Sequence, residues 1–500
     1  MEQHIDKYDV VVMGGGPAGY AATMRAIDLG KKVMLIEKNK IGGAGVYNGA
    51  LTSKTMWELS QKVSTINRSL YKAGRRRLDI TWEDVKETEK DAIFEKKFQY
   101  SSHLKMLQAK LKDSFSYVRG RGKMLSPHEV EVLCKDGTEM IVKTENIVIA
   151  TGSSPRTLPN IQVDEDVILT SDGIHHINDF PRSLVIVGAG VIGCEYATMF
   201  SNFGKTKVYL IDKADRILPF EDNDISDLVD ANLRKNGVTI HRQSSLVRLE
   251  KIDDEVEYEL AYEDGRREVI RVEKALLAVG RTPNIENIGM EEAGVMMSKR
   301  GRHIGDDDTQ TNVPNIYAVG DVSGRIALVN MGELEARHSI EKMFGVAKDR
   351  LSYENVSSIM FLEPEVAAVG MNEKQCTEKN IPIKVVKIDF SVITRAIAMR
   401  KTQGFFKIIV TNDDEMKILG MRAIGEHASS AIQACALLIK MNTGIGELAE
   451  LIHPHPSIIE GIQECVRMLM GKSVLKPSIF KDKLKCYSCV DGVCTPLQRL

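Results

Sequence analysis

The sequence carries one glycine pattern twice, each time between an apolar run and a helical pattern. The first copy is Gly14-x-Gly16-x-x-Gly19, directly after the β-branched run 8–13, and a second apolar run then ends in Glu37. Glycines at this spacing allow a tight turn and close approach of the backbone to a pyrophosphate. An acid at the end of the second strand accepts hydrogen bonds from ribose hydroxyls. The first copy therefore predicts a Rossmann-type dinucleotide site.

The second copy repeats each of these parts. The strand-like residues 184–187 lead into Gly188-x-Gly190-x-x-Gly193, and a further apolar run ends in Asp212. Two complete patterns predict two bound dinucleotides. Electron transfer between a flavin and a nicotinamide is the economical explanation of such a pair.

The acid that ends the second copy bears on the choice of nicotinamide. Asp212 favours a free 2′-hydroxyl, and hence NAD over NADP. Lys205, Lys213 and Arg216 lie near it in the sequence, and basic groups there could hold a 2′-phosphate. We therefore expect NAD(H), with NADP as the alternative.

Length and composition exclude several other classes of protein. The chain has 500 residues, enough for three or four domains, and its 43% hydrophobic and 27% charged residues are typical of globular proteins. The 67 Lys and Arg nearly balance the 69 Asp and Glu, which leaves no basic surplus for nucleic acid. No apolar run is long enough for a membrane span, and a strand-like run begins at residue 8. We expect a cytoplasmic protein with neither a nucleic-acid nor a membrane partner.

Further motifs follow in a set order, and the whole series covers about residues 8–470. They are Ala150-Thr151-Gly152, Gly280-Arg281, Gly320-Asp321, the segment 364–370, and His453-Pro-His455 followed by Glu460. Together with the two glycine patterns, they resemble the flavin-dependent pyridine nucleotide-disulfide oxidoreductases. That family contains dihydrolipoamide dehydrogenase, glutathione reductase, mercuric reductase and the soluble transhydrogenase.

The resemblance implies an α/β fold with two Rossmann-like dinucleotide-binding domains, for FAD and NAD, plus a C-terminal α+β dimerisation domain. We expect the FAD domain at residues 1–155 and 281–350 and the NAD(H) domain at 156–280. The dimerisation domain should span 351–471, and a cysteine-containing tail should span 472–500. The family also implies a homodimer that passes hydride from NADH to FAD and then electrons to an acceptor.

The resemblance assigns cofactor contacts to most of the motif residues. Asp321 should hydrogen-bond the ribityl chain of FAD, and Arg281 should lie where the flavin and nicotinamide domains meet. The expected cofactor-binding residues are Gly14, Gly16, Gly19, Glu37, Gly43, Lys54, Thr151, Gly152, Arg281, Gly320 and Asp321, together with Gly188, Gly190, Gly193, Asp212 and Gly280. We expect no metal ligands among the site residues.

Two residue pairs should carry the chemistry if the resemblance holds. Lys54 and Glu195 would form an ion pair beside the flavin, where a cation stabilises the anionic reduced ring. His455 and Glu460 would form an acid–base pair that serves the partner's flavin. Apart from the family, Lys54 is typical of a solvated helix lysine, and His455 of a rigid turn between prolines.

One segment departs from the family. Its disulfide reductases place Gly-Gly-x-Cys-x-x-x-x-Cys-x-x-Ser-Lys under the flavin, whereas this chain has Gly45 and Ala50 at the two cysteine positions. Glycine and alanine cannot form a disulfide, so the flavin cannot pass electrons to a neighbouring cystine. Lipoamide or glutathione reduction by that route is excluded.

The C-terminus offers another place for redox thiols. Cys486-x-x-Cys489-x-x-x-x-Cys494 follows five lysines, which lower thiol pKa values and favour thiolates. We expect Cys486 and Cys489 to be catalytic and to reach a flavin on an extended tether. Two alternatives remain open, namely a metal site, for which three thiols are one ligand short, and an inert tail.

Three functions are compatible with these features. The first is an NADH oxidoreductase that reduces a thiol, disulfide, polysulfide or metal acceptor through the tail cysteines. The second is a soluble transhydrogenase-like or diaphorase-like enzyme, in which the flavin transfers electrons directly to an acceptor. The third is a flavoprotein kept only as a structural subunit. The acceptor itself is not identified by the sequence.

Overall fold

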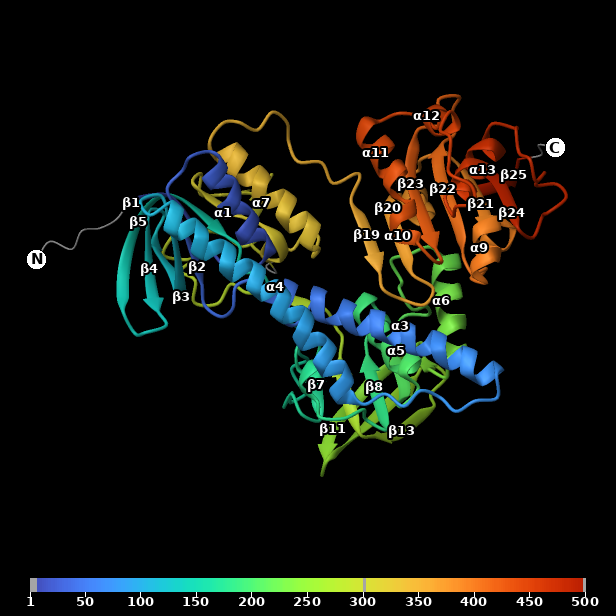
Figure 1. Ribbon diagram of the computed structural model, residues 1–500, viewed down its shortest axis with the longest axis horizontal. Helices are drawn as coiled ribbons and strands as arrows, with labels where there is room; N and C mark the ends of the chain where they lie inside the picture. The colour runs from blue at the N-terminus through green and yellow to red at the C-terminus, as the bar shows by residue number, and fades with distance from the viewer. Residues whose placement is uncertain (1–6, 300–302, 498–500) are drawn as a thin grey trace, which may run out of the picture. The chain divides into compact units, whose positions relative to one another are not determined.

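The computed structural model describes residues 7–299 and 303–497, and its elements are labelled in Figure 1. The chain forms two compact units, each built from three segments. The first unit comprises Met1–Leu59, Leu78–Phe180 and Leu276–Leu351. The second comprises Ser60–Arg77, Pro181–Ala275 and Ser352–Leu500. Among the described residues, no helix is long and apolar enough to cross a membrane.

The first unit contains the first glycine pattern on a parallel sheet. β1 (Lys7–Met13) pairs in parallel with β2 (Val33–Glu37) on one side and β5 (Glu139–Ile149) on the other. β3 (Phe115–Ser126) continues the sheet beyond β2, and β18 (Ile316–Ala318) continues it beyond β5. This arrangement brings the carboxyl ends of β1, β2, β5 and β18 to one edge, where ligands bind in open α/β sheets.

Helices and smaller strands complete the first unit. α1 (Pro17–Asp28) and α7 (Val329–Met343) pack side by side, as Figure 1 shows. Buried residues of both helices join the core formed by β1 and β2. The other elements are α2 (Gly43–Val46), α4 (Trp82–Lys110), β4 (Glu129–Cys134), β6 (Ser153–Pro155), β7 (Ile168–Thr170), η1 (Gly173–His176), β15 (Arg281–Pro283), β16 (Asp306–Asp307), β17 (Gln310–Thr311) and η2 (Gly320–Ser323). α3 (Ala50–Lys72) begins in this unit and ends in the second.

The second unit contains the second glycine pattern. β8 (Ser183–Val187), β9 (Lys207–Ile211) and β10 (Thr239–His241) pair in parallel, and α5 (Val191–Phe203) follows β8. The further elements of this part are α6 (Asn223–Lys235), β11 (Ser244–Ile252), β12 (Glu255–Tyr262), β13 (Arg267–Val272) and β14 (Lys274–Leu277). β11, β12 and β13 form an antiparallel sheet.

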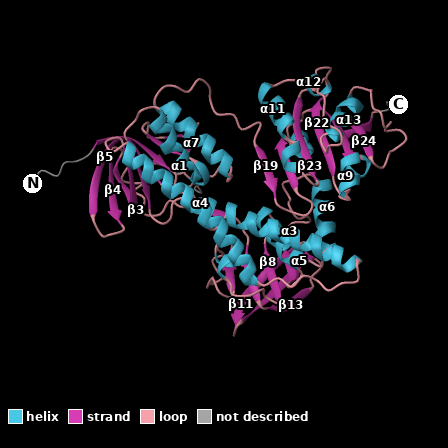
Figure 2. Ribbon diagram, viewed as in Figure 1, coloured by secondary structure: helices cyan, strands magenta, loops and turns pink. Residues whose placement is uncertain are grey.

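The C-terminal part of the second unit is a seven-stranded sheet in the order β19-β20-β23-β22-β21-β24-β25. Helices and strands of this part are distinguished by colour in Figure 2. The strands are β19 (Ser357–Met360), β20 (Val366–Gly370), β21 (Ile383–Asp389), β22 (Phe405–Thr411), β23 (Ile418–Ile424), β24 (Leu484–Val490) and β25 (Val493–Pro496). The helices are α8 (Glu373–Glu378), η3 (Phe390–Val392), α9 (Thr394–Met399), α10 (Ala428–Ala431), α11 (Gln433–Met441), α12 (Gly446–Ala449) and α13 (Glu460–Leu469).

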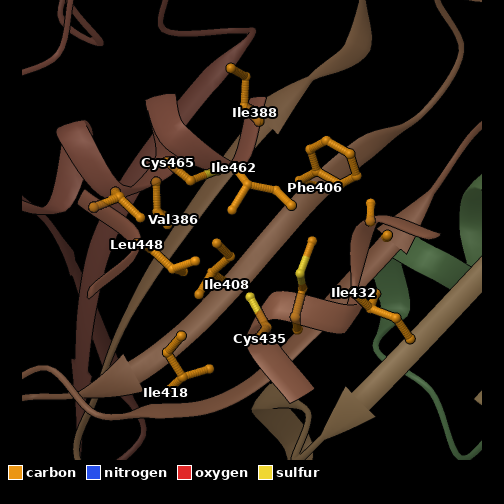
Figure 3. Packing of buried hydrophobic residues seen from close by; sticks show 14 of the residues in the cluster. Val386, Ile388, Phe406, Ile408, Ile418, Ile432, Cys435, Leu448, Ile462 and Cys465 are labelled. Carbon is orange, nitrogen blue, oxygen red and sulfur yellow. The ribbon is translucent and has the colours of Figure 1, made fainter. Parts of the chain in front are cut away.

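One face of this sheet is covered by helices. Val386 and Phe406 from the strands pack in one buried cluster with Cys435 of α11 and with Ile462 and Cys465 of α13 (Figure 3). Burying side chains of this size contributes about 1.5–3 kcal/mol each. The helix that begins with Glu460 is thereby held firmly against the sheet.

Candidate functional site

The first glycine turn is shaped for close backbone approach. Gly14 has a φ of +111°, and a Cβ there would lie 2.3 Å from the Ala150 carbonyl oxygen. A Cβ on Gly19 would lie 1.8 Å from the carbonyl oxygen of Gly14, so only glycine allows α1 to start this near β1. By contrast, no heavy atom lies within 4 Å of a Cβ built on Gly16. This open space at the start of α1 fits a dinucleotide pyrophosphate.

Glu37, the last residue of β2, accepts hydrogen bonds from the backbone of the same turn and of the residues after β2. Its Oε2 accepts a hydrogen bond from the Gly15 amide at 2.6 Å, and its Oε1 accepts one from the Asn39 amide at 2.6 Å. The side chain is buried. The carboxylate therefore has a set position beside the turn, which suits the expected contact with ribose hydroxyls.

The second glycine turn has the same geometry. Gly188 has a φ of +104°, and a Cβ on Gly193 would lie 1.9 Å from the Gly188 carbonyl oxygen, whereas the space beside Gly190 is open. Asp212 accepts hydrogen bonds from the amides of Ala189 at 2.6 Å and Ala214 at 2.9 Å. The two turns thus offer two equivalent cradles for dinucleotides, one in each unit.

Asp321 and Arg281 lie close together and share Ser153. Ser153 Oγ donates to Oδ2 of Asp321 at 2.5 Å, and Arg281 Nε donates to Ser153 Oγ at 2.7 Å. The Arg281 Nε also lies 3.9 Å from the Asp321 carboxylate. Ser153 was not among the predicted site residues, although it directly follows the Thr151-Gly152 motif and its place there could have pointed to it.

Thr151 and Asn284 join the chain just before β6 to the chain just after β15, the two strands that pair at this point. The Thr151 hydroxyl donates to the Asn284 carbonyl oxygen at 2.7 Å, and the side-chain amide of Asn284 donates to the Thr151 carbonyl oxygen at 3.0 Å. Gly152, Gly280 and Gly320 all have positive φ angles. They therefore lie at backbone turns that favour glycine.

The segment that departs from the family forms α2 and the start of α3. A Cβ on Gly45 would lie 2.6 Å from Cγ of Pro17, which is closer than real Cβ contacts allow. Gly43 has a φ of +49°, and a Cβ there would lie 3.2 Å from the Gly16 Cα. The loss of the first cysteine is thus accompanied by close packing of the backbone against the start of α1. Ala50 is the first residue of α3.

Lys54 and Glu195 belong to different units. The Lys54 ammonium donates to the Ser53 hydroxyl at 3.3 Å. The buried Glu195 accepts a hydrogen bond from the Phe361 amide at 3.0 Å. Their pairing beside a flavin stays a prediction.

His455 and Glu460 form the expected pair. Nδ1 of His455 lies 2.7 Å from Oε1 of Glu460, and Oε2 of Glu460 accepts the Ser457 amide at 2.8 Å. Burial raises the pKa of Glu460, but the bonds from His455 and Ser457 outweigh it and keep the pKa below its usual range. Glu460 thus stays ionised and orients the imidazole, whose side chain is 68% exposed.

The C-terminal segment is not an extended tether. β24 pairs antiparallel with β21 along its length, and β25 pairs with β24 through a two-residue turn at Asp491 and Gly492. Both turn residues have positive φ. An Asp-Gly pair between short runs is a strong hairpin signal, and this signal could have predicted the hairpin.

Cys486 and Cys489 both lie on β24, but they do not form the expected pair. Side chains three residues apart on a strand point to opposite faces. Cys486 packs against the cluster under α13, whereas Cys489 lies on the other face in a cluster with Cys376. Cys489 forms a disulfide with Cys494 across the hairpin, and Cys486 is not part of a disulfide. This disulfide also removes two thiols from the alternative metal site.

Comparison with known proteins decides the family. Residues 8–336 match the family described as pyridine nucleotide-disulphide oxidoreductase, and residues 356–466 match the dimerisation domain of that family. The chain belongs to the pyridine nucleotide-disulphide oxidoreductases. The dihydrolipoyl dehydrogenase of Bacillus subtilis (strain 168) is 32% identical over 476 residues, covering 94% of this chain and 99% of that protein. The mitochondrial dihydrolipoyl dehydrogenase 1 of Arabidopsis thaliana is 30% identical over 473 residues, covering 94% and 92%.

Solved structures of similar fold include LpdA from Mycobacterium tuberculosis, with a TM-score of 0.84 at 24% identity. They also include the Cu(II) complex of RclA, an HOCl-induced flavoprotein disulfide reductase from Escherichia coli, with a TM-score of 0.81 at 25% identity. Each alignment covers 93% of this chain and 100% of the other.

These matches confirm several expectations. The chain is a pyridine nucleotide-disulphide oxidoreductase with FAD and NAD domains and a C-terminal dimerisation domain, and it is an oxidoreductase of the dihydrolipoyl dehydrogenase type. The family binds FAD and NAD(P). The electron acceptor of this chain is not defined by the matches.

Proposed function

We propose that this oxidoreductase takes hydride from NADH onto FAD and transfers electrons from the flavin directly to an acceptor, without a disulfide between them. One observation carries the proposal: Gly45 and Ala50 occupy the positions of the family's redox cysteines, and Gly45 packs too closely on Pro17 to hold a side chain. Bound FAD would supply the two-electron chemistry that the side chains themselves lack.

The residues of the chain would have separate tasks. The turn at Gly14 to Gly19 and Glu37 would hold the FAD diphosphate and ribose, and Asp321 would contact the ribityl chain. The turn at Gly188 to Gly193 would hold NAD(H) in the same way, with Asp212 on the ribose. Asp212 favours NADH because its charge would repel the 2′-phosphate of NADPH.

We further propose a homodimer in which His455 and Glu460 act as an acid–base pair at the flavin of the partner. Their contact of 2.7 Å and the exposure of the imidazole support a proton-transfer role. The Lys54–Glu195 ion pair would balance the charge of the reduced flavin. A cytoplasmic location remains a prediction from the sequence.

A second candidate function is reduction of a disulfide or polysulfide acceptor through the hairpin disulfide. The observation that favours it is the disulfide Cys489–Cys494, in which Cys494 is exposed. Two electrons from the reduced flavin would convert this disulfide to two thiols, and the exposed Cys494 thiolate could then attack an acceptor disulfide. In this case Cys489 and Cys494, rather than Cys486 and Cys489, form the reactive pair.

Rapid mixing tests the proposal. NADH should bleach the flavin at a lower concentration than NADPH, and a quinone or dye should reoxidise it in the wild-type protein and in Cys489→Ser/Cys494→Ser at equal rates. Failure of NADH to bleach the flavin would refute the proposal. Loss of all acceptor turnover in the double variant would instead favour the disulfide route.

A further inference from the structure

One cavity of the second unit opens beside the hairpin disulfide. It has a volume of about 370 Å³, within the range of small-molecule pockets, and Cys494 forms part of its wall. The other residues that line it are Asp224, Lys387, Lys485, Tyr487 and Pro496. A cysteine whose disulfide can exchange with thiols therefore borders a space that a small molecule can enter.

The strand register places the charged part of this wall and the disulfide on one face of the sheet. Lys387 of β21 lies directly opposite Lys485 of β24. Side chains alternate along a strand, so residues 485, 487 and 489 of β24 point to the same face. Cys489 of that face is bonded to Cys494. The two lysines and the disulfide hence lie on the same side of the sheet.

The two lysines are a like-charge pair that the protein neutralises only in part. Like charges directly opposite each other destabilise an antiparallel pair of strands. Lys387 Nζ donates to Oδ2 of Asp224 at 2.8 Å, but Oδ1 of the same carboxylate accepts from Lys407 at 2.7 Å. Among the described residues, no carboxylate forms an ion pair with Lys485. Positive charge is thus left over at the cavity wall.

The pKa of Lys387 is lowered by its surroundings. Burial lowers this pKa most, Asp224 raises it, and Lys407 and Lys485 lower it further. The net pKa lies below the usual range of a lysine. An anion bound beside the ammonium would offset the repulsion between the lysines and favour the charged form.

The two sulfurs of the disulfide differ in access. Cys494 is exposed, whereas Cys489 is 8% exposed and packs in a cluster with Cys376 and Ile383. A thiolate from solution therefore reaches the Cys494 sulfur, and Cys489 provides the leaving sulfur. Its apolar surroundings disfavour the Cys489 thiolate, so the leaving sulfur takes up a proton.

We propose that this cavity binds small organic thiols and disulfides that carry a negative charge, and that these exchange with the hairpin disulfide at Cys494. Lys387 and Lys485 would hold the anionic group, and Tyr487 and Pro496 would contact the organic part. The inference names a substrate class for the second candidate function, on which it rests for the supply of electrons from the flavin. Binding and exchange themselves do not require the flavin.

The exchange balances in bonds and electrons. A substrate thiolate attacks Cys494, and a bond forms between the two sulfurs as the Cys489–Cys494 bond breaks and the Cys489 sulfur leaves with the electron pair. A second substrate thiolate attacks the substrate sulfur of this mixed disulfide, which releases the substrate disulfide and the Cys494 thiolate. Two substrate thiols are oxidised and one protein disulfide is reduced. The reverse sequence reduces a substrate disulfide once the hairpin carries two thiols.

The test compares two related thiols on the full-length oxidised protein, without NADH. 2-Mercaptoethanesulfonate carries a negative charge, and 2-mercaptoethanol is neutral. Opening of the hairpin disulfide is followed by acid quenching, alkylation and mass measurement of the hairpin peptide. Each rate is divided by the thiolate concentration, because the thiolate is the attacking species.

The anionic thiol should open the disulfide faster. Two lysines near the surface should give a rate ratio of anionic to neutral thiol of at least about five. The ratio should fall towards one in about 1 M salt, which screens exposed charges. The chain as a whole has a net charge of -2, so attraction by the whole molecule would not produce this preference.

One lysine variant and a matched control assign the preference to the cavity. Lys485→Gln should lower the ratio at least about twofold and leave the 2-mercaptoethanol rate unchanged. Lys384→Gln removes a lysine from the other face of β21, where its ammonium donates to the Asp413 carbonyl oxygen at 2.9 Å, and should keep the wild-type ratio. Equal rates per thiolate in the wild-type protein, or an unchanged ratio in Lys485→Gln, would overturn the inference. Two free thiols at Cys489 and Cys494 before any thiol is added would overturn it as well.

Failure of the flavin route would give a different result. NADH is added to the oxidised protein, and the hairpin peptide is again alkylated and its mass measured. If NADH produces no hairpin thiols, while the anionic preference and its loss in Lys485→Gln are both seen, the second candidate function fails and the binding site stands.

Discussion

At the scale of single residues, Gly45 is a position where one added carbon should be harmful. The Cβ of an alanine would lie 2.6 Å from Pro17 Cγ at the start of α1. We expect Gly45→Ala to lower the free energy of unfolding by about 1–3 kcal/mol through overpacking, and to reduce the FAD content. Denaturation and flavin absorbance measure both. Gly446→Ala, at a helical glycine with open space around it, is the control and should change neither. A stable Gly45→Ala that is full of flavin would show that the turn can relax.

Lys407 is the second residue with a large expected effect. Its side chain is fully buried on β22 and lies 2.7 Å from both Asp222 and Asp224 and 2.8 Å from Glu373. Removing this buried cation, which contacts all three carboxylates, would leave them uncompensated, at a cost of about 3–5 kcal/mol in the free energy of unfolding. We expect Lys407→Met to lower the free energy of unfolding by this amount, measured by guanidinium denaturation. Lys440→Met, on the exposed face of α11, should lower it little.

Asp224 determines how the stability lost in Lys407→Met should depend on pH. Burial raises its pKa, but Lys407 and Lys387 outweigh burial and hold the pKa below the ordinary 3.8. A lowered pKa contributes stability that is present above the unfolded value and is lost as pH falls through the folded value. The difference between wild type and Lys407→Met should therefore narrow below about pH 4. A constant difference down to pH 3 would contradict this account.

At the scale of elements, a disulfide joins β24 to β25 and should stabilise the hairpin that they form. The Cys489–Cys494 disulfide closes a loop of about six residues, for which loop-closure entropy gives about 2 kcal/mol. We expect Cys489→Ser/Cys494→Ser to speed hydrogen exchange of the amides in β24 and β25, with no change in β22 and β23. Equal exchange in both proteins would show that pairing with β21 alone holds the hairpin.

The elements also show what the sequence could and could not predict. The two glycine turns were located correctly because each is local: strand, turn, helix and acid lie within about 30 residues. The hairpin was missed because its Asp491-Gly492 turn signal was not used, and its pairing with β21 joins it to a strand about 100 residues earlier in the chain. Pairing between distant segments leaves no periodic signal in either segment.

At the scale of the whole molecule, site residues in local motifs could be predicted from the sequence, whereas contacts between distant segments could not. His455 and Glu460 were expected to form a pair from the motif order, and the structure shows their contact. The cofactor contacts expected of Asp321 and Arg281 stay predictions. The contact of Thr52 with His175 and that of Lys407 with Asp222 join segments that are more than 100 residues apart. Such contacts arise only from the fold, so residue types and spacings could not reveal them.

With Gly45 and Ala50 in place of the family's redox cysteines, no disulfide should store electrons between the flavin and the acceptor. The remaining cysteine of α5, Cys194, is fully buried, and burial raises the pKa of its thiol, which disfavours the thiolate. Anaerobic titration of Cys489→Ser/Cys494→Ser with dithionite and NADH measures how many electrons the protein takes up. We expect saturation at about two electrons per flavin and no long-wavelength thiolate-to-flavin band. Uptake of about four electrons, or the appearance of that band, would contradict it.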